Sequence, residues 1–174
     1  NRLSKVTGLS DISVKKVGYS NELGITIIAY ENCNIDLLKN NQITNISDIK
    51  RKEVVGLKTI NNITIKNNIA YLSSSLGLIL IDMLNNEIID TYSIGEQNDN
   101  TIINGCAFLG DSIIAATSNG MYFADINSQN LTDFNSWVLY DDTYDTYDNI
   151  ITYDGLINID HFSDIISISH NNNS

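Results

Sequence analysis

The chain has 174 residues, of which 43% are hydrophobic, and its 21 acidic against 10 basic residues give a formal net charge of −11. This length can build one sizeable core, so a single domain is expected. So acidic a chain is repelled by nucleic acid and by anionic headgroups, which disfavours nucleic acid as a partner. No long apolar run is present, so no membrane span is predicted.

The N-terminal residues predict the end of a structural unit rather than its beginning. Residues 1–6 are expected to form the last strand of a preceding blade, with Arg2 to Lys5 as that strand. No initiating Met, charged n-region or apolar h-region precedes them, so neither a start codon nor a signal peptide is represented. We therefore expect this sequence to be a piece of a longer protein.

One phrase recurs along the chain. YLSSSLGLILID at 71–82 returns as IAATSNGMYFAD at 114–125, and both its glycine and its closing Asp recur after 43 residues. A further step of 43 back from the first glycine reaches an Asn, the non-glycine residue that best tolerates positive φ. A repeat of this size is typical of a four-stranded propeller blade. The recurring positions are Asn34, Gly77, Gly120, Asp82 and Asp125.

Strand and turn signals alternate within each unit, and no segment keeps the apolar spacing of an amphipathic helix. ITIIAY and LILID are apolar on both faces, which suits strands that lie between neighbouring blades. Short polar or glycine-containing pairs separate the strands and predict tight hairpins. These pairs are Asn67-Asn68, Asn85-Asn86, Gly110-Asp111 and Asp154-Gly155.

These signals together predict an all-β chain that is part of a β-propeller with about four blades of four antiparallel strands. The expected repeats are 7–50, 51–94, 95–142 and 143–174. A larger propeller is favoured. The alternative is a closed four-bladed ring in which residues 1–6 complete the fourth blade. A cut propeller would expose strand edges and self-associate, whereas a compact monomer would support the ring.

The two recurring glycines carry a specific expectation. Gly77 and Gly120 stand at the entry of a β-turn, where a left-handed backbone is needed. Positive φ is predicted at both, and replacement by Val should cost about 1 to 3 kcal/mol of strain.

Metal and cofactor sites are weakly indicated, and none is predicted. A string of aspartates interleaved with tyrosines could supply oxygen ligands to Ca²⁺, but a solvated connection between blades is favoured. DMLNNE at 82–87 and DINSQN at 125–130 lack the glycine and terminal Glu of an EF-hand, so turn chemistry is expected there. The weak metal candidates are Asp141, Asp142, Asp145 and Asp148.

The remaining chemically versatile residues are given structural roles. His161 and His170 have no cysteine nearby and are read as surface or edge positions. Cys33 and Cys106 could pair in an exported protein, but they lie in different blades, so free and partly buried thiols are favoured. Trp137 is expected to pack an outer strand against the next blade, rather than to stack on a carbohydrate.

Catalytic motifs are missing from the sequence. Serines 73–75 have no G-x-S-x-G context, and the Ser-x-Asp-x-Gly boxes of sialidase-type propellers are not found. No glycine-rich loop is followed by a helix, which disfavours a phosphate-binding loop. The chain is therefore predicted not to be an enzyme.

Four phrases in matching order carry a family resemblance: RLSKVTGLSD, AYENCNIDLLKNNQITNISDIK, AYLSSSLGLILIDMLNNEIIDTYSIG and IAATSNGMYFADINSQNLTDFNSW. The chain resembles the PorZ N-terminal β-propeller family of the type IX secretion system of Bacteroidetes. The likeness covers roughly residues 2 to 140 and weakens after Asp141.

This resemblance implies a non-enzymatic component at the outer cell surface or in the periplasm. It implies other secretion-complex proteins as partners, and lipopolysaccharide as a further contact of the full-length protein. A chain of net charge −11 would repel that anionic glycolipid, so the contact is expected elsewhere or through divalent cations. The alternative is a periplasmic, oligosaccharide-sensing propeller of a hybrid two-component regulator.

Overall fold

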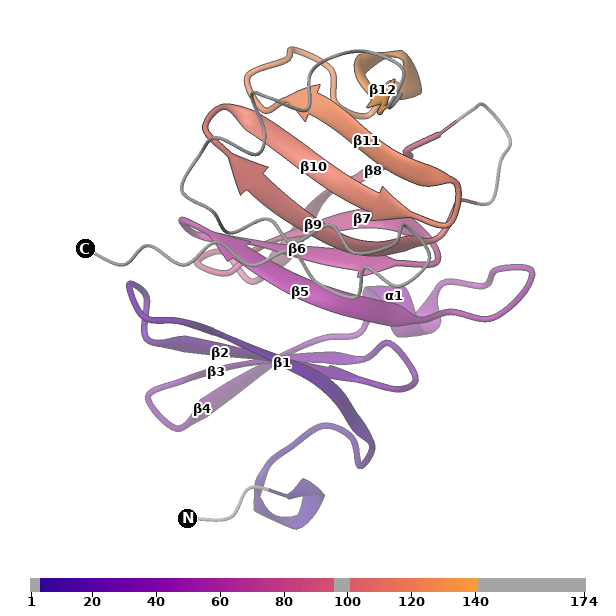
Figure 1. The fold of residues 1–174 in the computed structure, drawn as a ribbon. Helices are drawn as coiled ribbons and strands as arrows, with labels where there is room; N and C mark the ends of the chain where they lie inside the picture. Colours follow the sequence, from indigo (N-terminus) through magenta and orange to yellow (C-terminus); the bar gives the residue numbers. More distant parts are fainter. Residues whose placement is uncertain (1–3, 96–100, 141–174) are drawn as a thin grey trace, which may run out of the picture.

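The computed structural model describes residues 4–95 and 101–140, which form three four-stranded antiparallel sheets (Figure 1). In each sheet the strands pair in the order in which they follow along the chain, as in a propeller blade. The predicted all-β propeller class is confirmed, while the expected fourth repeat at 143–174 lies outside the described residues. Blade 1 is β1 (Val14–Ser20), β2 (Ile25–Tyr30), β3 (Ile35–Lys39) and β4 (Gln42–Ile46); blade 2 is β5 (Ile60–Lys66), β6 (Ile69–Ser74), β7 (Gly77–Asp82) and β8 (Glu87–Tyr92); blade 3 is β9 (Ile103–Leu109), β10 (Ser112–Thr117), β11 (Gly120–Asp125) and β12 (Val138–Leu139).

Three short helical segments accompany the sheets: η1 (Lys5–Thr7), α1 (Asp48–Arg51) and η2 (Phe134–Ser136). The first of them corrects the sequence prediction. Lys5 was expected to end a strand, but it begins a 3₁₀ turn, and Ser4 before it is not in a strand either. The position of this stretch in the repeat therefore did not suffice to predict a strand at Ser4 and Lys5.

The first strands of the blades lie next to one another, β1 against β5 and β5 against β9. These are the strands that face the common axis of a propeller. Gly18 lets blades 1 and 2 approach closely, because a Cβ atom there would lie 3.0 Å from the Ile63 side chain. The other strands of each blade then fan outward (Figure 1).

Blade 2 is apolar on both faces because each face packs on a neighbouring blade. Leu72 and Ile81 belong to the core shared with blade 1, whereas Leu78 and Leu80 belong to the core shared with blade 3. Successive side chains of a strand point to opposite faces, so a run such as LILID must be apolar throughout. The prediction made from this run is confirmed.

Polar and aromatic contacts join blades 2 and 3. The Asn61 amide donates to the carbonyl of Ile103 at 2.8 Å, and the Thr64 hydroxyl donates to the carbonyl of Cys106 at 2.8 Å. Trp137 is buried, its ring lies 6.2 Å from that of Tyr92 on β8, and its indole N–H donates to the carbonyl of Leu131. The tryptophan was expected to pack an outer strand against the next blade; it packs instead against the outer strand of the preceding blade, blade 2.

The recurring phrase forms the same hydroxyl-capped turn in blades 2 and 3. The Ser74 hydroxyl donates to the carbonyl of Gly77 at 2.6 Å and accepts from the Leu76 N–H. The Thr117 hydroxyl makes the equivalent bond to the carbonyl of Gly120 at 2.8 Å. The two glycines have φ of 111° and 127°, which confirms the prediction of a left-handed backbone at both.

Blade 1 departs from this turn because its loop is one residue longer. Asn34 was expected to take the positive φ of the glycine, but that conformation falls on Cys33, at φ 61°. The backbone N–H of Tyr30 donates to the carbonyl of Asn34, so the strand pairing resumes at the repeat position. The extra residue shifts the left-handed position back by one.

Candidate functional site

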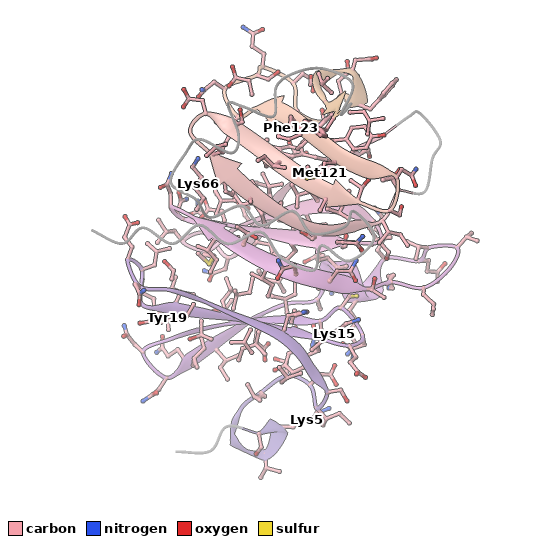
Figure 2. The ribbon with its side chains drawn as sticks, in the orientation of Figure 1. Lys5, Lys15, Tyr19, Lys66, Met121 and Phe123 are labelled. Carbon is pink, nitrogen blue, oxygen red and sulfur yellow. The ribbon has the colours of Figure 1, made fainter. Side chains whose placement is uncertain are left out.

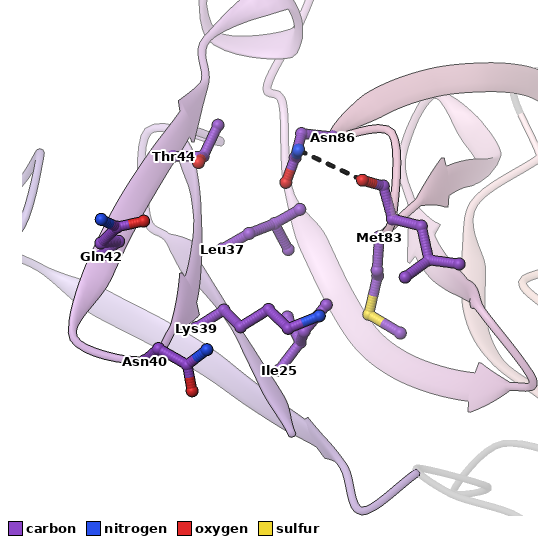
Figure 3. Close-up of a pocket in the computed structure, with 9 residues that line it drawn as sticks. Ile25, Leu37, Lys39, Asn40, Gln42, Thr44, Met83 and Asn86 are labelled. Carbon is purple, nitrogen blue, oxygen red and sulfur yellow. Dashed lines mark hydrogen bonds between the residues drawn. The ribbon is translucent and has the colours of Figure 1, made fainter. Parts of the chain in front are cut away.

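A cleft opens between blades 1 and 2, where the β3–β4 hairpin faces the β7–β8 loop (Figure 3). Its volume is about 200 Å³. Three buried apolar side chains form the floor, and amides, a hydroxyl and one ammonium group surround the mouth. The floor is Ile25, Leu37 and Met83, and the remaining lining residues are Lys39, Asn40, Gln42, Thr44, Leu84 and Asn86.

Lys39 supplies the only charge of this lining, and the hairpin fixes its position. It pairs with Gln42 across a two-residue turn, Asn40 and Asn41, whose φ values of 50° and 63° are those of a tight hairpin. Its ammonium group points toward the floor of the cleft (Figure 3). No hydrogen bond or ion pair within the described ranges 4–95 and 101–140 engages this group.

The repeat shows why no carboxylate is needed at Lys39. Lys39 lies 43 residues before Asp82 and 86 before Asp125, so it occupies the repeat position that is acidic in the other two blades. Blades 2 and 3 need a carboxylate there to cap a longer loop, whereas the tight Asn40-Asn41 turn of blade 1 does not. This charge reversal is visible in the sequence from the 43-residue spacing of Lys39, Asp82 and Asp125.

Asp82 holds the blade 2 side of the cleft. Its carboxylate accepts the backbone N–H groups of Leu84 at 2.8 Å and Asn85 at 3.1 Å. These backbone hydrogen bonds lower the pKa of Asp82, and the bond from Asn85 has the largest effect. Burial acts in the opposite direction but is outweighed. In blade 3, Asp125 accepts the N–H of Asn127 at 2.8 Å in the same way. Both loops therefore use Asp for turn chemistry, as predicted.

A second exposed feature is the connection from α1 to β5, the loop formed by residues 52–58. Val55 at its tip is fully exposed, and Leu57 is 87% exposed. Gly56 between them has φ 99° and no neighbouring atom within 4 Å of a Cβ position. The sequence analysis did not predict a role for this loop, because Val54, Val55 and Leu57 form no periodic pattern.

The base of the 52–58 loop is anchored at both ends. The Lys58 ammonium donates to the carbonyls of Ile49 at 3.1 Å, Lys50 at 2.7 Å and Lys52 at 2.7 Å. The Ser75 hydroxyl donates to the carbonyl of Leu57 and accepts the backbone N–H of Thr59, which lies just after the loop. The apolar tip therefore projects from a fixed base.

Charge is distributed very unevenly along the chain. The first 66 residues contain all 10 Lys and Arg residues but only 6 of the 21 Asp and Glu residues. Their formal net charge is therefore +4, whereas that of residues 67–174 is −15. The cleft and the 52–58 loop both belong to blade 1 or its junction with blade 2, the less acidic part of the chain. The overall charge of −11 therefore does not describe the surroundings of either feature.

The predicted metal candidates Asp141, Asp142, Asp145 and Asp148 lie outside the described residues, as do both histidines. Across residues 4–95 and 101–140, no group of three or more His, Cys, Asp or Glu side chains is placed to hold a metal ion. The serines at 74 and 75 have structural partners in turns and at the loop base.

Cys33 and Cys106 are both free and buried. Burial raises the pKa of the Cys106 thiol to about 11, and burial likewise raises that of Cys33. Because the thiolate is the reactive form, neither thiol should react with Ellman's reagent at pH 8 in the folded protein, and both should react after denaturation. Fast reaction of the native protein, or no reaction after denaturation without a reductant, would contradict this assignment.

The three meander sheets, with their first strands side by side, define the class of protein: a β-propeller. The model of the TSS9, PorZ, N-terminal beta-propeller domain family matches residues 1–138. The chain belongs to this family, whose namesake is a component of a secretion system and not of a known enzyme class. No curated protein sequence matches the chain.

Solved structures extend the comparison. PorZ of Porphyromonas gingivalis, described as an essential bacterial surface component of the type IX secretion system, matches with 28% identity and a TM-score of 0.71 over 80% of this chain. Two structures of the extracellular domain of a proposed one-component or hybrid two-component system of B. thetaiotaomicron match with 19% and 21% identity, TM-scores of 0.61 and 0.58, over 82% and 76% of this chain. These two show the fold alone.

The chain spans 18% of the length of the chain in each of these three structures. Within residues 4–95 and 101–140 no helix is both long enough and apolar enough to cross a membrane.

Proposed function

We propose that this chain is a non-enzymatic part of a PorZ-type surface component, and that it contacts other proteins of the secretion complex through the 52–58 loop. The family match over residues 1–138 supports the secretion role and a location at the cell surface or in the periplasm. The observation that supports this contact is that Val55 and Leu57 are exposed at the tip of a loop whose base is held by hydrogen bonds. Large apolar side chains that project into solvent commonly mark an interaction site.

A protein surface fits this loop better than a membrane does. The tip has no Trp, Tyr or Phe, the residues that usually anchor a protein at a bilayer interface. Glu53 beside it would be repelled by an anionic leaflet, while Lys52 and Arg51 are attracted. The complementary partner surface is a small apolar pocket with a mainly acidic rim, since the loop and α1 together carry more cations than anions.

The double variant V55S/L57S tests this contact in the natural full-length protein. Removing two anchoring side chains should reduce co-purification with the secretion-complex proteins at least tenfold, because a few central residues carry most binding energy. Quantitative mass spectrometry of the co-purified outer-membrane proteins measures the loss. The matched control is I12S/I89S, which removes two other exposed apolar side chains, 76% and 47% exposed. Equal loss with both pairs, or none with V55S/L57S, would refute the proposed contact; loss of vesicle binding instead would indicate a membrane.

Lipopolysaccharide is a second proposed contact of the full-length protein. The positive balance of residues 1–66 makes blade 1 and the start of blade 2 the favoured place for an anionic glycolipid within this chain. The oligosaccharide sensor remains the alternative function, supported by the fold of the two B. thetaiotaomicron structures. A glycan array separates the two, because a sensor should select one oligosaccharide irrespective of its charge.

A further inference from the structure

We propose that the cleft between blades 1 and 2 binds a small aliphatic carboxylate, with the carboxylate on the Lys39 ammonium group and the hydrocarbon part against Leu84, next to Met83. This site is separate from the 52–58 loop and does not depend on the proposed secretion role. The cleft combines a cation that has no partner in residues 4–95 and 101–140 with a buried apolar floor. No Asp or Glu lines it, although the chain has 21 of them.

The polar lining is suited to the two oxygens of a carboxylate. Asn40 lies in the turn after Lys39 and Gln42 pairs with Lys39 across it, so both side-chain amides border the cleft on the hairpin side and can donate N–H groups to a ligand. Across the cleft, one N–H of the Asn86 amide already donates to the carbonyl of Leu84 at 3.4 Å, which leaves its second N–H as the donor available to a carboxylate. Charge-assisted hydrogen bonds of this kind are stronger than neutral ones.

The floor and the size of the cleft select the rest of the ligand. Ile25, Leu37 and Met83 close the floor but are only 1–2% exposed. The apolar surface that a hydrocarbon group can cover is the side chain of Leu84, which lines the cleft and is 52% exposed. About 200 Å³ is room for roughly six or seven water molecules, smaller than the ~300 to 1,000 Å³ of sites for drug-sized ligands. A branched chain of four or five carbons fits this space.

Other ligand classes fit less well. No aromatic side chain lines the cleft, so a sugar ring has no stacking surface. A phosphate is satisfied by several cations or a nest of backbone N–H groups, and this lining offers a single ammonium group. An aliphatic carboxylate is found in a free branched-chain acid and at the C-terminus of a peptide that ends in Leu or Val.

Methyl NMR gives a direct readout because the chain contains two methionines, Met83 on the cleft floor and Met121 in blade 3 (Figure 2). In protein labelled at the methionine methyl groups, isocaproate should shift the Met83 signal saturably and leave Met121 unmoved. Acetate, which lacks the hydrocarbon part, and isocaproamide, which lacks the charge, should each bind at least tenfold more weakly. Equal shifts at both methionines, or equal affinity for the acid and its amide, would overturn the proposal.

The variant K39Q keeps the length and polarity of the side chain and removes its charge. It should weaken isocaproate binding at least tenfold, while K15Q, which removes an exposed lysine of β1 outside the cleft, should not. N-acetyl-leucine, as a probe of a peptide C-terminus, should compete for the same Met83 shift if the natural ligand is a peptide end. Binding of isocaproate without such competition assigns a free acid. Unchanged binding in K39Q would refute the site.

Discussion

Replacing Gly77 by Ala should destabilise the protein by about 3 kcal/mol or more. A left-handed backbone at a residue with a side chain costs about 1 to 3 kcal/mol, and Gly77 has φ 111°. In addition, the new Cβ would lie 2.5 Å from the backbone carbonyl oxygen of Tyr92 on β8, and overpacking adds about another 1 to 3 kcal/mol. Urea unfolding followed by the fluorescence of Trp137, the single tryptophan, measures the loss.

Gly120→Ala is the matched control for this substitution. Its φ of 127° is equally unfavourable, but its Cβ would meet the end of the Leu139 side chain at 2.9 Å rather than a backbone atom. Because a side chain can rotate away, we expect about 1 to 3 kcal/mol from backbone strain alone. Equal costs at the two glycines would show that the contact with Tyr92 does not matter.

Replacing Asp36 by Asn should cost about 2 to 4 kcal/mol at pH 7, because this carboxylate is fully buried and satisfied by neutral donors. It accepts the backbone N–H of Ser10 at 2.8 Å, the hydroxyl of Tyr30 at 2.6 Å and the amide of Asn45 at 2.9 Å. An amide in its place turns an N–H group toward one of these donors. The Ser10 bond also holds the N-terminal segment on blade 1, beside the buried Leu9.

The stability of this network should depend on pH. Burial would raise the pKa of Asp36, but the hydrogen bonds from Ser10, Tyr30 and Asn45 outweigh burial and lower it. A carboxyl group with a depressed pKa in the folded state stabilises the fold above its unfolded pKa of about 4, and this contribution is lost as the pH falls through the folded value.

Unfolding measured between pH 5 and pH 3 tests this dependence. The wild type should lose stability more steeply than D36N, by up to about 1.4 kcal/mol per pH unit for one proton. Asp11 and Asp82 also have lowered pKa values, so the difference between the two slopes is the quantity to compare. Parallel pH curves for wild type and D36N would mean that folding does not shift the pKa of Asp36, and a wild type that gains stability relative to D36N as the pH falls would mean that its pKa is raised; either result would contradict the network.

The repeat made the blades predictable from sequence, because each blade repeats one local solution. Gly77 and Gly120 could be placed at a left-handed turn since nothing but glycine adopts that backbone freely. Asn67 and Gly110 likewise predicted tight hairpins, and both residues have positive φ in the structure. Alternation and turn chemistry are local properties, which is why they survive in the structure.

The features that differ between blades could not be predicted in the same way. The positive φ at Cys33 depends on a single extra residue in one loop, which shifts the left-handed position without changing the repeat spacing. Asp36 was not recognised as a buried charge because its donors come from three separate segments. The cleft at Lys39 exists only once two blades are packed together.

The regular blades hold two irregular features that are candidates for binding, the 52–58 loop and the Lys39 cleft. The blades present rigid edges, and the 52–58 loop and the Lys39 cleft interrupt their regularity near the junction of blades 1 and 2. Binding residues commonly lie on loops held by a rigid scaffold, which is the arrangement found here.

A cryo-electron microscopy structure of the secretion complex that contains the natural full-length protein is the most direct test. It should show β1, β5 and β9 lining the axis of a propeller, with another protein of the complex covering Val55 and Leu57. A map in which this tip projects into solvent, while partners contact other surfaces, would contradict the proposed role of the loop.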